Sequence, residues 1–590
     1  MKKFLLTVLA VIVGGIILSI LPLFFMVVIA SALSSSKESP VKDNSVLTYN
    51  LETDVVDRGA DNPMLLLSRR LSGSDGASIN LMTLLDNIDK AAVDNRIKGI
   101  VLEGSSANIP LAHIREVRNH LQEFKKSGKF IYYHSTSIEQ SALYVASLAD
   151  KIYVAPEGMV PVYGVVSQQI FYKDLLDKIN VDAQIIRHGK FKSAVEPYFL
   201  NTMSEESRIQ TQRYVDEIWN TMSNDIAESR GIEKEKVDMY ANAYDFAYTK
   251  YAVDAGLIDG VKYYDEYLSE LRGTLGVGEK DEINTVSITT YSNVSVYRPE
   301  KQFAKRKIAL VTASGQIYDG YNDGDVENIY GESFSRAIRK ARQDSTIEAI
   351  VLRVNSPGGS ASAADIIWRE VKLASEVKPV VVSMGQYAAS GGYYISCAAN
   401  YIYAQPSTLT GSIGVFGVVP CAKKLMNNLG VHTQTVSSNN ETPVSYLEPL
   451  TPTQSKFMHN MVEHVYTSFV NRCAEGRRCS AEHIDSIGQG RVWAGADALK
   501  IGLVDELGSI DDAIAKAKAL ASIDEEVNIV NFPEEEDPFK MMMKQMGVDV
   551  KGFVAKSILG DTYSMIETVK AQFGEKPHVE ARIEEFVTIK

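Results

Sequence analysis

Cysteine is scarce in this sequence, and the common metal-binding patterns are missing from it. The 590 residues include only four cysteines, at positions 397, 421, 473 and 479, which are too few to build a disulfide scaffold. No CxxC pair and no HExxH motif occurs, so the sequence predicts neither a metal site nor a cofactor. Cys473 and Cys479 are six positions apart, and the sequence leaves open whether they form a disulfide or stay free thiols.

Basic residues are outnumbered by acidic ones. The chain has 61 Lys and Arg against 74 Asp and Glu, which gives a net charge of −13 at pH 7. Proteins that bind nucleic acids concentrate Lys and Arg against the phosphates, so this balance argues against nucleic acid as a partner. No GxxxxGK[ST] motif is present, and no GxGxxG opens a strand–helix unit, which gives nucleotide binding little support.

Charge is absent altogether from a long segment near the N-terminus. No charged residue lies between Lys3 and Lys37, and residues 4–30 are nearly all apolar. About 20 such residues span a bilayer, so we expect an uncleaved transmembrane anchor at residues 1–36. A signal peptide cleaved near Ala30-Ser31-Ala32 is the alternative. The apolar core of a signal peptide is usually about 7–15 residues long, and the apolar stretch here is much longer. The lysines before the anchor should stay in the cytoplasm, which places the rest of the chain outside.

The remainder of the chain contains one pattern twice. An apolar strand followed by an amphipathic helix occurs at 96–121 and again at 346–374, and the likeness continues from 129–156 to 378–406. This period is far too long for a solenoid, so it indicates two tandem copies of a domain. We expect the boundaries to lie as follows: first repeat 46–275, connector 276–306, second repeat 307–590.

Each copy alternates strands with helices. Residues 347–354 and 378–385 are short β-branched runs, as expected for strands that are buried on both faces. The segment between them has small and apolar residues near helical spacing, at Ala364, Ile367, Val371 and Ala374. The order strand–helix–strand predicts an α/β fold with a parallel sheet in each half.

Ser390 stands between an apolar run and a segment that begins a helix at Tyr393. A serine at such a junction is commonly a helix N-cap, and it can also be a nucleophile presented on a tight turn. A nucleophile needs a base, but no histidine lies within forty residues, and the nearest is His432. The residues around Ser390 alone therefore favour the N-cap interpretation over the nucleophile.

The two copies differ after the strand that ends near Asn355. The second copy continues with NSPGGS (355–360), whereas the first has GSSAN (104–108) without proline or the glycine pair. Paired glycines allow backbone N–H groups to point at a bound group, as an oxyanion hole requires. A plain tight turn explains the pair equally well.

Two further segments distinguish the copies. Ser390-Gly391-Gly392 of the second copy faces Ser141-Ala142-Leu143 of the first, so both keep the serine and only the second keeps the glycines. The segment 410–414, TGSIG, faces MVPV at 159–162, where the small and hydroxyl residues are gone. These differences favour the second copy as the one with a nucleophile site.

The first copy keeps lysines that the second lacks. HGKFKSAVEPYF (188–199) contains Lys190 and Lys192, and the corresponding SNNETPVSYLEP (438–449) contains none. Both lysines could lie on the surface, but the apolar and small residues around Lys192 favour partial burial. A buried lysine loses its proton more readily and can then act as a base. We therefore expect a composite site, with serine from one copy and lysine from the other.

Several motifs occur in one order: FKSAVEP, NSPGGS, AASGGYYIS, LTGSIGVFG and GADALKIGLVDELG. In these motifs and their order, the whole chain resembles the long, tandem-repeat form of signal peptide peptidase A, a family of membrane-anchored bacterial serine proteases. The resemblance implies tandem Clp protease/crotonase-like domains built from β-β-α units. Matched by position, it implies Ser390 as nucleophile, Lys192 as general base and Ser412 as the hydroxyl that positions the lysine. It also implies oxyanion donors, at Gly358 or Gly359 and at Gly391.

The resemblance further implies a function and a location. The implied function is that of a Ser-Lys endopeptidase that degrades cleaved signal peptides. The implied location is the bacterial inner membrane, with the catalytic domains on the periplasmic side. It implies a homo-oligomer such as a tetramer, and leaves open whether serine and lysine come from one chain. Lys190 is the competing base. Two other functions compete: a membrane-tethered scaffold with a vestigial site, and a crotonase-type enzyme acting on acyl-CoA, which the expected external location disfavours.

Overall fold

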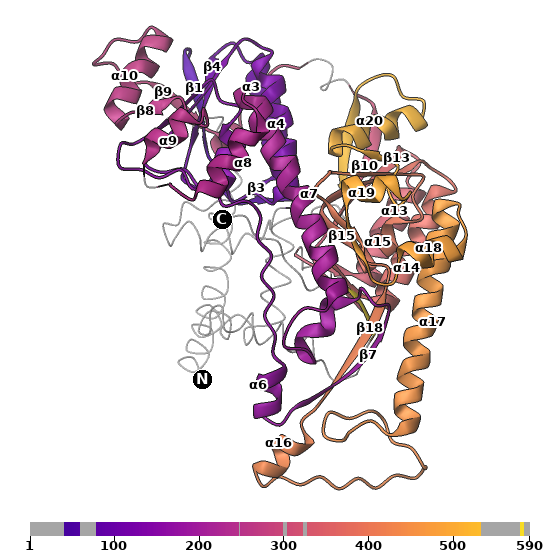
Figure 1. Ribbon diagram of the computed structural model, residues 1–590. Coiled ribbons are helices and arrows are strands. Elements are labelled where there is room, and N and C mark those ends of the chain that lie inside the picture. Colours follow the sequence, from indigo (N-terminus) through magenta and orange to yellow (C-terminus); the bar gives the residue numbers. More distant parts are fainter. Residues whose placement is uncertain are drawn as a thin grey trace, which may run out of the picture.

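The computed structural model describes residues 41–58, 78–246, 248–298, 304–322, 327–532 and 579–582. It consists of two α/β units that lie side by side, one for each repeat (Figure 1). The expected anchor at residues 1–36 lies outside these ranges. Among the helices in the described ranges, none combines the length and the apolar character needed to cross a bilayer.

The first repeat is built on a parallel sheet of six strands in the order β8-β6-β5-β4-β1-β9. These strands are β1 (Ser45–Asn50), β4 (Ile97–Glu103), β5 (Phe130–Ser135), β6 (Lys151–Val154), β8 (Gly260–Val261) and β9 (Asn284–Ser287). Its helices are α3 (Leu81–Val93), α4 (Leu111–Lys125), α5 (Gln140–Ala146), α6 (Lys173–Lys178), α7 (Glu205–Arg230), α8 (Lys234–Ala243), α9 (Thr249–Asp254), α10 (Tyr264–Leu275) and α11 (Ile288–Tyr291). A short pair, β2 (Val55–Val56) and β3 (Ile79–Asn80), lies beside them.

The second repeat has the same plan. Strands β20-β16-β15-β13-β10-β21 match the six strands of the first sheet, and all pair in parallel. They are β10 (Arg306–Ser314), β13 (Ile347–Ser356), β15 (Val380–Ala389), β16 (Tyr401–Ala404), β20 (Glu506–Leu507) and β21 (Val527–Phe532); the sheet also extends through β17 (Leu409–Gly411) to β19 (Val492–Ala494). Its helices are α13 (Gly331–Gln343), α14 (Ala361–Ser375), α15 (Gly391–Ser396), α16 (Lys423–Asn428), α17 (Pro452–Arg477), α18 (Ala481–Ile487), α19 (Gly495–Lys500) and α20 (Ile510–Leu520). The duplication and the parallel sheets are confirmed.

Helix α14 forms as its sequence predicts. Ser360 accepts the N–H of Ala363 at the helix start, which satisfies one of the free amides of the first turn. The four positions expected on the inner face, Ala364, Ile367, Val371 and Ala374, are all buried. Their spacing therefore reflects one apolar stripe that packs against the sheet.

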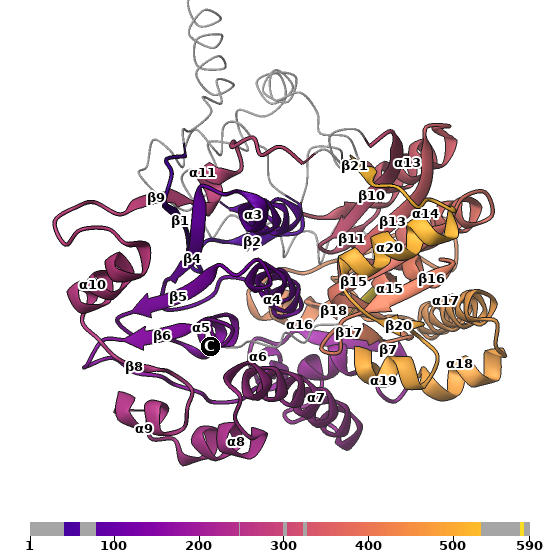
Figure 2. The same ribbon diagram turned by 90° about the horizontal axis from the view of Figure 1, so that it is seen from above.

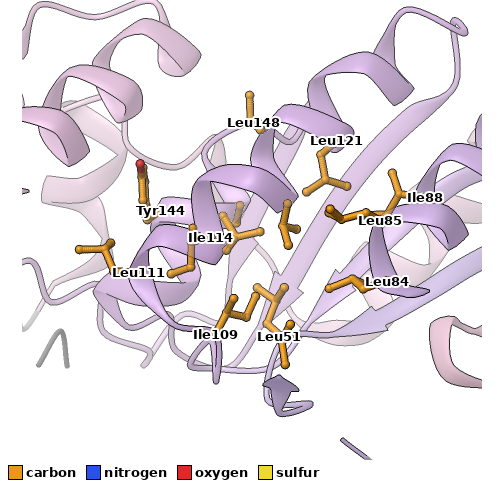
Figure 3. Packing of buried hydrophobic residues seen from close by; sticks show 14 of the residues in the cluster. Leu51, Leu84, Leu85, Ile88, Ile109, Leu111, Ile114, Leu121, Tyr144 and Leu148 are labelled. Atoms are coloured by element: carbon orange, nitrogen blue, oxygen red, sulfur yellow. The ribbon is translucent and has the colours of Figure 1, made fainter. Parts of the chain in front are cut away.

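Helices α3 and α4 pack against each other in the first repeat (Figure 3). Leu84, Leu85 and Ile88 of α3 meet Ile114 and Leu121 of α4, and each of these side chains is buried. Complete burial of one such side chain stabilises the fold by about 1.5–3 kcal/mol. Helix α4 also contacts β15 of the second repeat, and one buried cluster continues from α3 and α4 onto the second sheet, so the repeats share a core (Figure 2).

The expected connector at 276–306 is partly wrong. Residues 284–287 form β9, which pairs in parallel with β1 at the edge of the first sheet. In the second sheet β21 pairs with β10 in the same way, so β9 is the closing strand of the first repeat. Helix α11 follows it and packs on β1 and α3. The first repeat thus extends at least to Tyr291 of α11.

A third sheet joins the two repeats, in the order β12-β11-β14-β22-β18-β7. Its strands are β7 (Asp182–His188), β11 (Ile317–Tyr318), β12 (Ile329–Tyr330), β14 (Gly358–Ser360), β18 (Val415–Cys421) and β22 (Val579–Arg582). Strand β7 comes from the first repeat and runs antiparallel to β18 of the second over its full length. This pairing carries the segment after β7, which contains Lys192, into the second repeat.

Candidate active site

Ser390 occupies a strained turn between β15 and α15. Its backbone has φ 56° and ψ −117°, a region in which a residue other than glycine costs about 1–3 kcal/mol. The Ser390 N–H donates to the carbonyl of Gly411 at 2.8 Å, which holds the turn against β17. Ser390 stands at the N-cap position of α15, yet its side chain makes no capping hydrogen bond. The N-cap interpretation is therefore wrong for this hydroxyl.

Lys192 is held by contacts from both repeats. The N–H of Phe191 donates to the carbonyl of Gln489 at 2.9 Å. On the other side, the amide of Gln210 on α7 donates to the Phe191 carbonyl at 3.1 Å. Gly490, at φ 79°, packs so closely that a Cβ there would lie 2.6 Å from the Lys192 Cβ. The backbone on either side of Lys192 is thus clamped, and its side chain points inward.

The side chains of Lys192, Ser390 and Ser412 meet in the interior. Lys192 Nζ donates to Ser390 Oγ at 2.8 Å and to Ser412 Oγ at 3.1 Å. It also lies 3.3 Å from the Ser412 carbonyl oxygen. The exposed fractions are 0% for Lys192 and Ser390 and 1% for Ser412. Three of the residues expected from the sequence therefore lie together, within one chain.

Ser412 is itself fixed by the backbone around it. It has φ 50°, and its N–H donates to the carbonyl of Arg491 at 2.7 Å. Its hydroxyl lies 3.4 Å from the Gly490 carbonyl, toward which it donates. The oxygen of Ser412 that faces Lys192 is therefore available as an acceptor. This arrangement fixes the direction of the lysine amine toward Ser390.

Lys190 does not reach this site. Its side chain is exposed, and its Nζ lies over the ring of the neighbouring Phe191, 5.3 Å from the ring centroid. The expectation that Lys190 competes with Lys192 is therefore wrong on geometry. Lys192 is the lysine in contact with Ser390.

The glycines expected as oxyanion donors lie around Ser390, with different backbone roles. Gly358 has φ 104°, and its N–H donates to Ser356 Oγ at 3.2 Å. Gly359, in the same strand, leaves no room for a Cβ, which would lie 2.0 Å from the Ile317 carbonyl oxygen. Gly391 is the first residue of α15, so its N–H has no carbonyl one turn earlier in the helix. Of the three, only Gly391 directly follows Ser390 in the chain, which makes its N–H the first candidate donor.

The backbone of β22 fills the space between β14 and β18. It runs antiparallel to both, with Ala581 opposite Gly359 and Glu580 opposite Phe416. Helix α15, which begins next to Ser390, also contacts β22. An extended segment of the chain therefore lies between β14 and β18, in contact with the helix that begins next to Ser390.

Some features of the site have no sequence signal that would have revealed them. Gln210 and Gly490 hold the Lys192 segment, but neither belongs to a recognisable motif, and Gly490 is one of 40 glycines. The four cysteines are free thiols in the structure, so Cys473 and Cys479 are not joined in it. Cys473 is buried, and burial raises the pKa of its thiol well above the ordinary value. A thiol of this kind is a poor nucleophile.

Comparison with known proteins places this geometry in a family. The family model described as "Peptidase family S49" matches the chain twice, at residues 123–278 and 372–524. "Protease 4" of Salmonella typhi is 35% identical over 90% of this chain and 87% of its own length. "Serine protease SPPA, chloroplastic" of Arabidopsis thaliana is 31% identical over 90% of this chain and 78% of its own.

Among solved structures, a ClpP1 mutant from Listeria monocytogenes gives a TM-score of 0.24 at 18% identity. The aligned region covers 35% of this chain and 94% of that one. The family model matches once in each repeat, and both relatives align over 90% of this chain. The chain belongs to peptidase family S49 and is a serine protease of its long, two-repeat type.

Proposed function

We propose that this protease is a membrane-anchored endopeptidase that degrades cleaved signal peptides with a Ser-Lys dyad. Ser390 is the nucleophile and Lys192 is the general base. The observation that carries the proposal is the 2.8 Å contact between Lys192 Nζ and Ser390 Oγ, in a site closed to solvent. Both the strained turn at Ser390 and the clamped segment around Lys192 support a preorganised pair.

Catalysis begins with a proton transfer. Complete burial penalises the ammonium form of lysine, so the neutral amine is favoured and can accept a proton. Lys192 Nζ takes the proton of Ser390 Oγ while that oxygen attacks the peptide carbonyl, and the C=O π electrons move onto the carbonyl oxygen. Ser412 Oγ, 3.1 Å from Nζ, keeps the amine directed at Ser390 during this step.

The second half of the reaction returns the proton. As the tetrahedral intermediate collapses, Lys192 gives its proton to the departing amine, and an acyl-enzyme remains on Ser390. Water then attacks the ester with Lys192 again acting as base. The oxyanion is held by backbone N–H groups, with Gly391 as the first donor; Gly358 of β14 can join it only by giving up its hydrogen bond to Ser356 Oγ. Each such donor contributes about 2.7–4 kcal/mol to transition-state stabilisation.

The dyad has a direct test in its pH dependence. A fluorophosphonate probe should label the peptide that contains Ser390, and the labelling rate should rise with pH. Below the pKa of Lys192 the ammonium cannot accept a proton, and above that pKa the neutral amine can. The labelled residue is identified by peptide mapping. A rate that stays flat from about pH 5 to 9 would contradict a titrating lysine base in that range.

The substrate binds as an extended strand between β14 and β18. The pairing of β22 with both strands supports this, because it occupies the edges to which a peptide would add its own backbone hydrogen bonds. On this proposal β22 competes with substrate. The anchor expected at residues 1–36 would keep the site near signal peptides left in the same bilayer and raise their effective concentration.

Removal of β22 should therefore increase activity. We expect truncation after residue 578 to raise kcat/KM for a peptide about threefold or more, mainly through a lower KM, because an internal competitor has been removed. Truncation after residue 582 keeps β22 and is the matched control, with kcat/KM near that of the full chain. Equal kcat/KM for the two truncated proteins would contradict competition by β22.

The protease assembles as a homo-oligomer, of which a tetramer is the form implied by the sequence resemblance. Support comes from two arms, residues 166–181 with α6 and 422–445 with α16, which lie side by side below β7 and β18 in Figure 1. The N–H of Leu425 in one arm donates to the carbonyl of Asn180 in the other. The arms expose large apolar side chains, among them Ile170, Leu175, Leu429 and Val436, the last with 91% exposed.

Such side chains favour contact with a second copy of the chain. Light scattering of the purified protein should give a mass several times that of one chain. Val436→Glu should lower that mass, whereas Val93→Glu, at an exposed position on α3, should leave it unchanged. A single-chain mass for the parent protein would contradict the assembly.

A further inference from the structure

A buried ion cluster lies between the repeats, apart from the dyad. Arg353 of β13 is only 1% exposed, and it contacts two carboxylates of the first repeat. Its guanidinium donates to Asp57 Oδ1 at 3.0 Å and to the two oxygens of Glu116 at 2.8 and 2.7 Å. A third partner, Ser383 Oγ, lies on the adjacent strand β15 at 2.9 Å. The cluster thus fixes Asp57 at the ends of the strands that lead to the active site.

The second oxygen of Asp57 continues toward the site through Asn355. Asp57 Oδ2 accepts the side-chain amide of Asn355 at 2.6 Å. The carbonyl end of that same amide accepts the backbone N–H of Tyr387 at 3.1 Å. Asn355 is three residues before Gly358, and Tyr387 is three residues before Ser390. The Asn355 side chain therefore connects the segment that leads to the β14 glycines with the segment that leads to Ser390.

Tyr387 belongs to a bulge in β15. Val354 pairs with Met384, but the next pair is Ser356 with Ala388, so Asn355 alone faces residues 385–387. Bulges redirect a strand and are common beside active sites. In the first repeat the equivalent strands β4 and β5 pair in regular register. The bulge thus occurs in the repeat that carries Ser390.

Asp57 determines which way the Asn355 amide points. An ionised carboxylate only accepts hydrogen bonds, so it turns the NH2 end toward itself and leaves the carbonyl for the Tyr387 N–H. Burial acts to raise the pKa of Asp57, but His113 and Arg353 outweigh it and hold that pKa well below the ordinary range. The His113 Nε2 lies 3.1 Å from Asp57 Oδ1. Asp57 is therefore ionised at neutral pH.

The first repeat contacts the bulge at a second point. Helix α4 begins after Pro110, which supplies no side-chain cap. Its first N–H, on Leu111, is accepted by the side-chain oxygen of Gln386 at 3.0 Å. Gln386 lies within the bulge, so the bulge caps a helix of the other repeat. The shape of β15 before Ser390 therefore depends on how the two repeats dock.

We propose that Asp57 is a positioning residue for catalysis: through Asn355 it sets the bulge of β15, and so places Ser390 relative to the β14 glycines. This inference rests on the proposed role of Ser390. The first repeat then serves the reaction twice, by supplying Lys192 and by orienting the strand that carries the nucleophile. Asp57 touches no reacting atom, so its effect is on geometry.

An exchange of the two side chains tests the proposal. Asp57→Asn puts an NH2 group where an acceptor is needed, and Asn355→Asp puts two carboxylates in contact. Each single variant should lower kcat at least about tenfold with KM changed less than about threefold, because a small misplacement of a nucleophile is costly. In the double variant, the introduced amide donates to the introduced carboxylate, which still accepts the Tyr387 N–H. The double variant should return kcat to within about threefold of the parent.

Asp497→Asn is the matched control for a lost ion pair between repeats. Asp497 accepts two hydrogen bonds from Arg213, both at 2.7 Å, and this pair joins α7 to α19, away from the chain of contacts from Asp57 through Asn355. This variant should lower the melting temperature and leave kcat of the folded protein near the parent value. The proposal is overturned if the single variants lose melting temperature but keep kcat, or if the folded double variant does not regain kcat. Fluorophosphonate labelling of the parent protein tests the nucleophile separately. If the probe did not label Ser390, the proposed function would fail independently of the Asp57 variants.

Discussion

Ser390→Ala is expected to reduce peptide hydrolysis at least about a thousandfold, because it removes the atom that forms the acyl-enzyme. The fold should survive the change. Ser390 already has φ 56°, and alanine experiences the same backbone strain as serine there. The lost contact is one hydrogen bond from Lys192 to a hydroxyl, without loss of apolar packing. The measurements are kcat/KM on a fluorogenic peptide, fluorophosphonate labelling and the melting temperature.

The chain provides its own control for this substitution. Ser141 is the serine of the first repeat that corresponds to Ser390, and its hydroxyl accepts the N–H of Ala107 at 2.9 Å. Ser141→Ala should cost about 1 kcal/mol of stability, since it removes the hydrogen bond that the half-buried Ala107 N–H donates. It should leave kcat/KM unchanged. If Ser390→Ala cleaves peptides as fast as Ser141→Ala, Ser390 is not the nucleophile.

The duplication made much of the fold predictable. The apolar runs at 347–354 and 378–385 and the helix between them could be recognised because their periodicity reflects burial against one sheet. The closing strand β9 could not be recognised in the same way. It is four residues long and only one of them, Val286, is buried, so its sequence resembles a polar connector. Its pairing with β1, far away in the sequence, is what makes it a strand.

The residue types of the candidate site could be predicted from the sequence, but the residues that hold them in place could not. The loss of lysine from one repeat and of glycines from the other indicated a composite site, and the family resemblance selected Lys192 over Lys190. The role of Asp57 had no such signal. Asp57 precedes the segments that are similar in the two repeats, and nothing in the residues around it marks it as functional. Its importance depends on the docking of the two repeats, which brings it to Arg353 and Asn355.

The shared core explains why the two repeats cannot be considered separately. Helix α4 of the first repeat packs on β15 of the second, and β7 pairs with β18. Lys192 therefore reaches Ser390 only when both repeats are folded and docked. A fragment containing the second repeat alone would keep Ser390 and the glycines but lose Lys192, the proposed base.

Lys192→Met should be about as damaging as loss of the nucleophile, with kcat reduced about a thousandfold or more. Methionine has nearly the length of lysine and suits a buried site, so the side-chain volume is kept while the amine is removed. The Ser390 hydroxyl then has no base at 2.8 Å. The residual rate should also lose its rise with pH, because the titrating group is gone. Steady-state kinetics across pH on the purified protein measure both effects.

Lys190→Met is the matched control, because Lys190 belongs to the same short segment but is exposed and lies over Phe191. It should retain kcat/KM and the pH dependence of the parent. If Lys190→Met were inactive while Lys192→Met kept its activity, the base would be two residues earlier and the buried contact would be only structural. If both variants remained active with an unchanged pH profile, neither lysine would be the base. The two variants together therefore test whether the buried amine, and no other feature of this segment, activates Ser390.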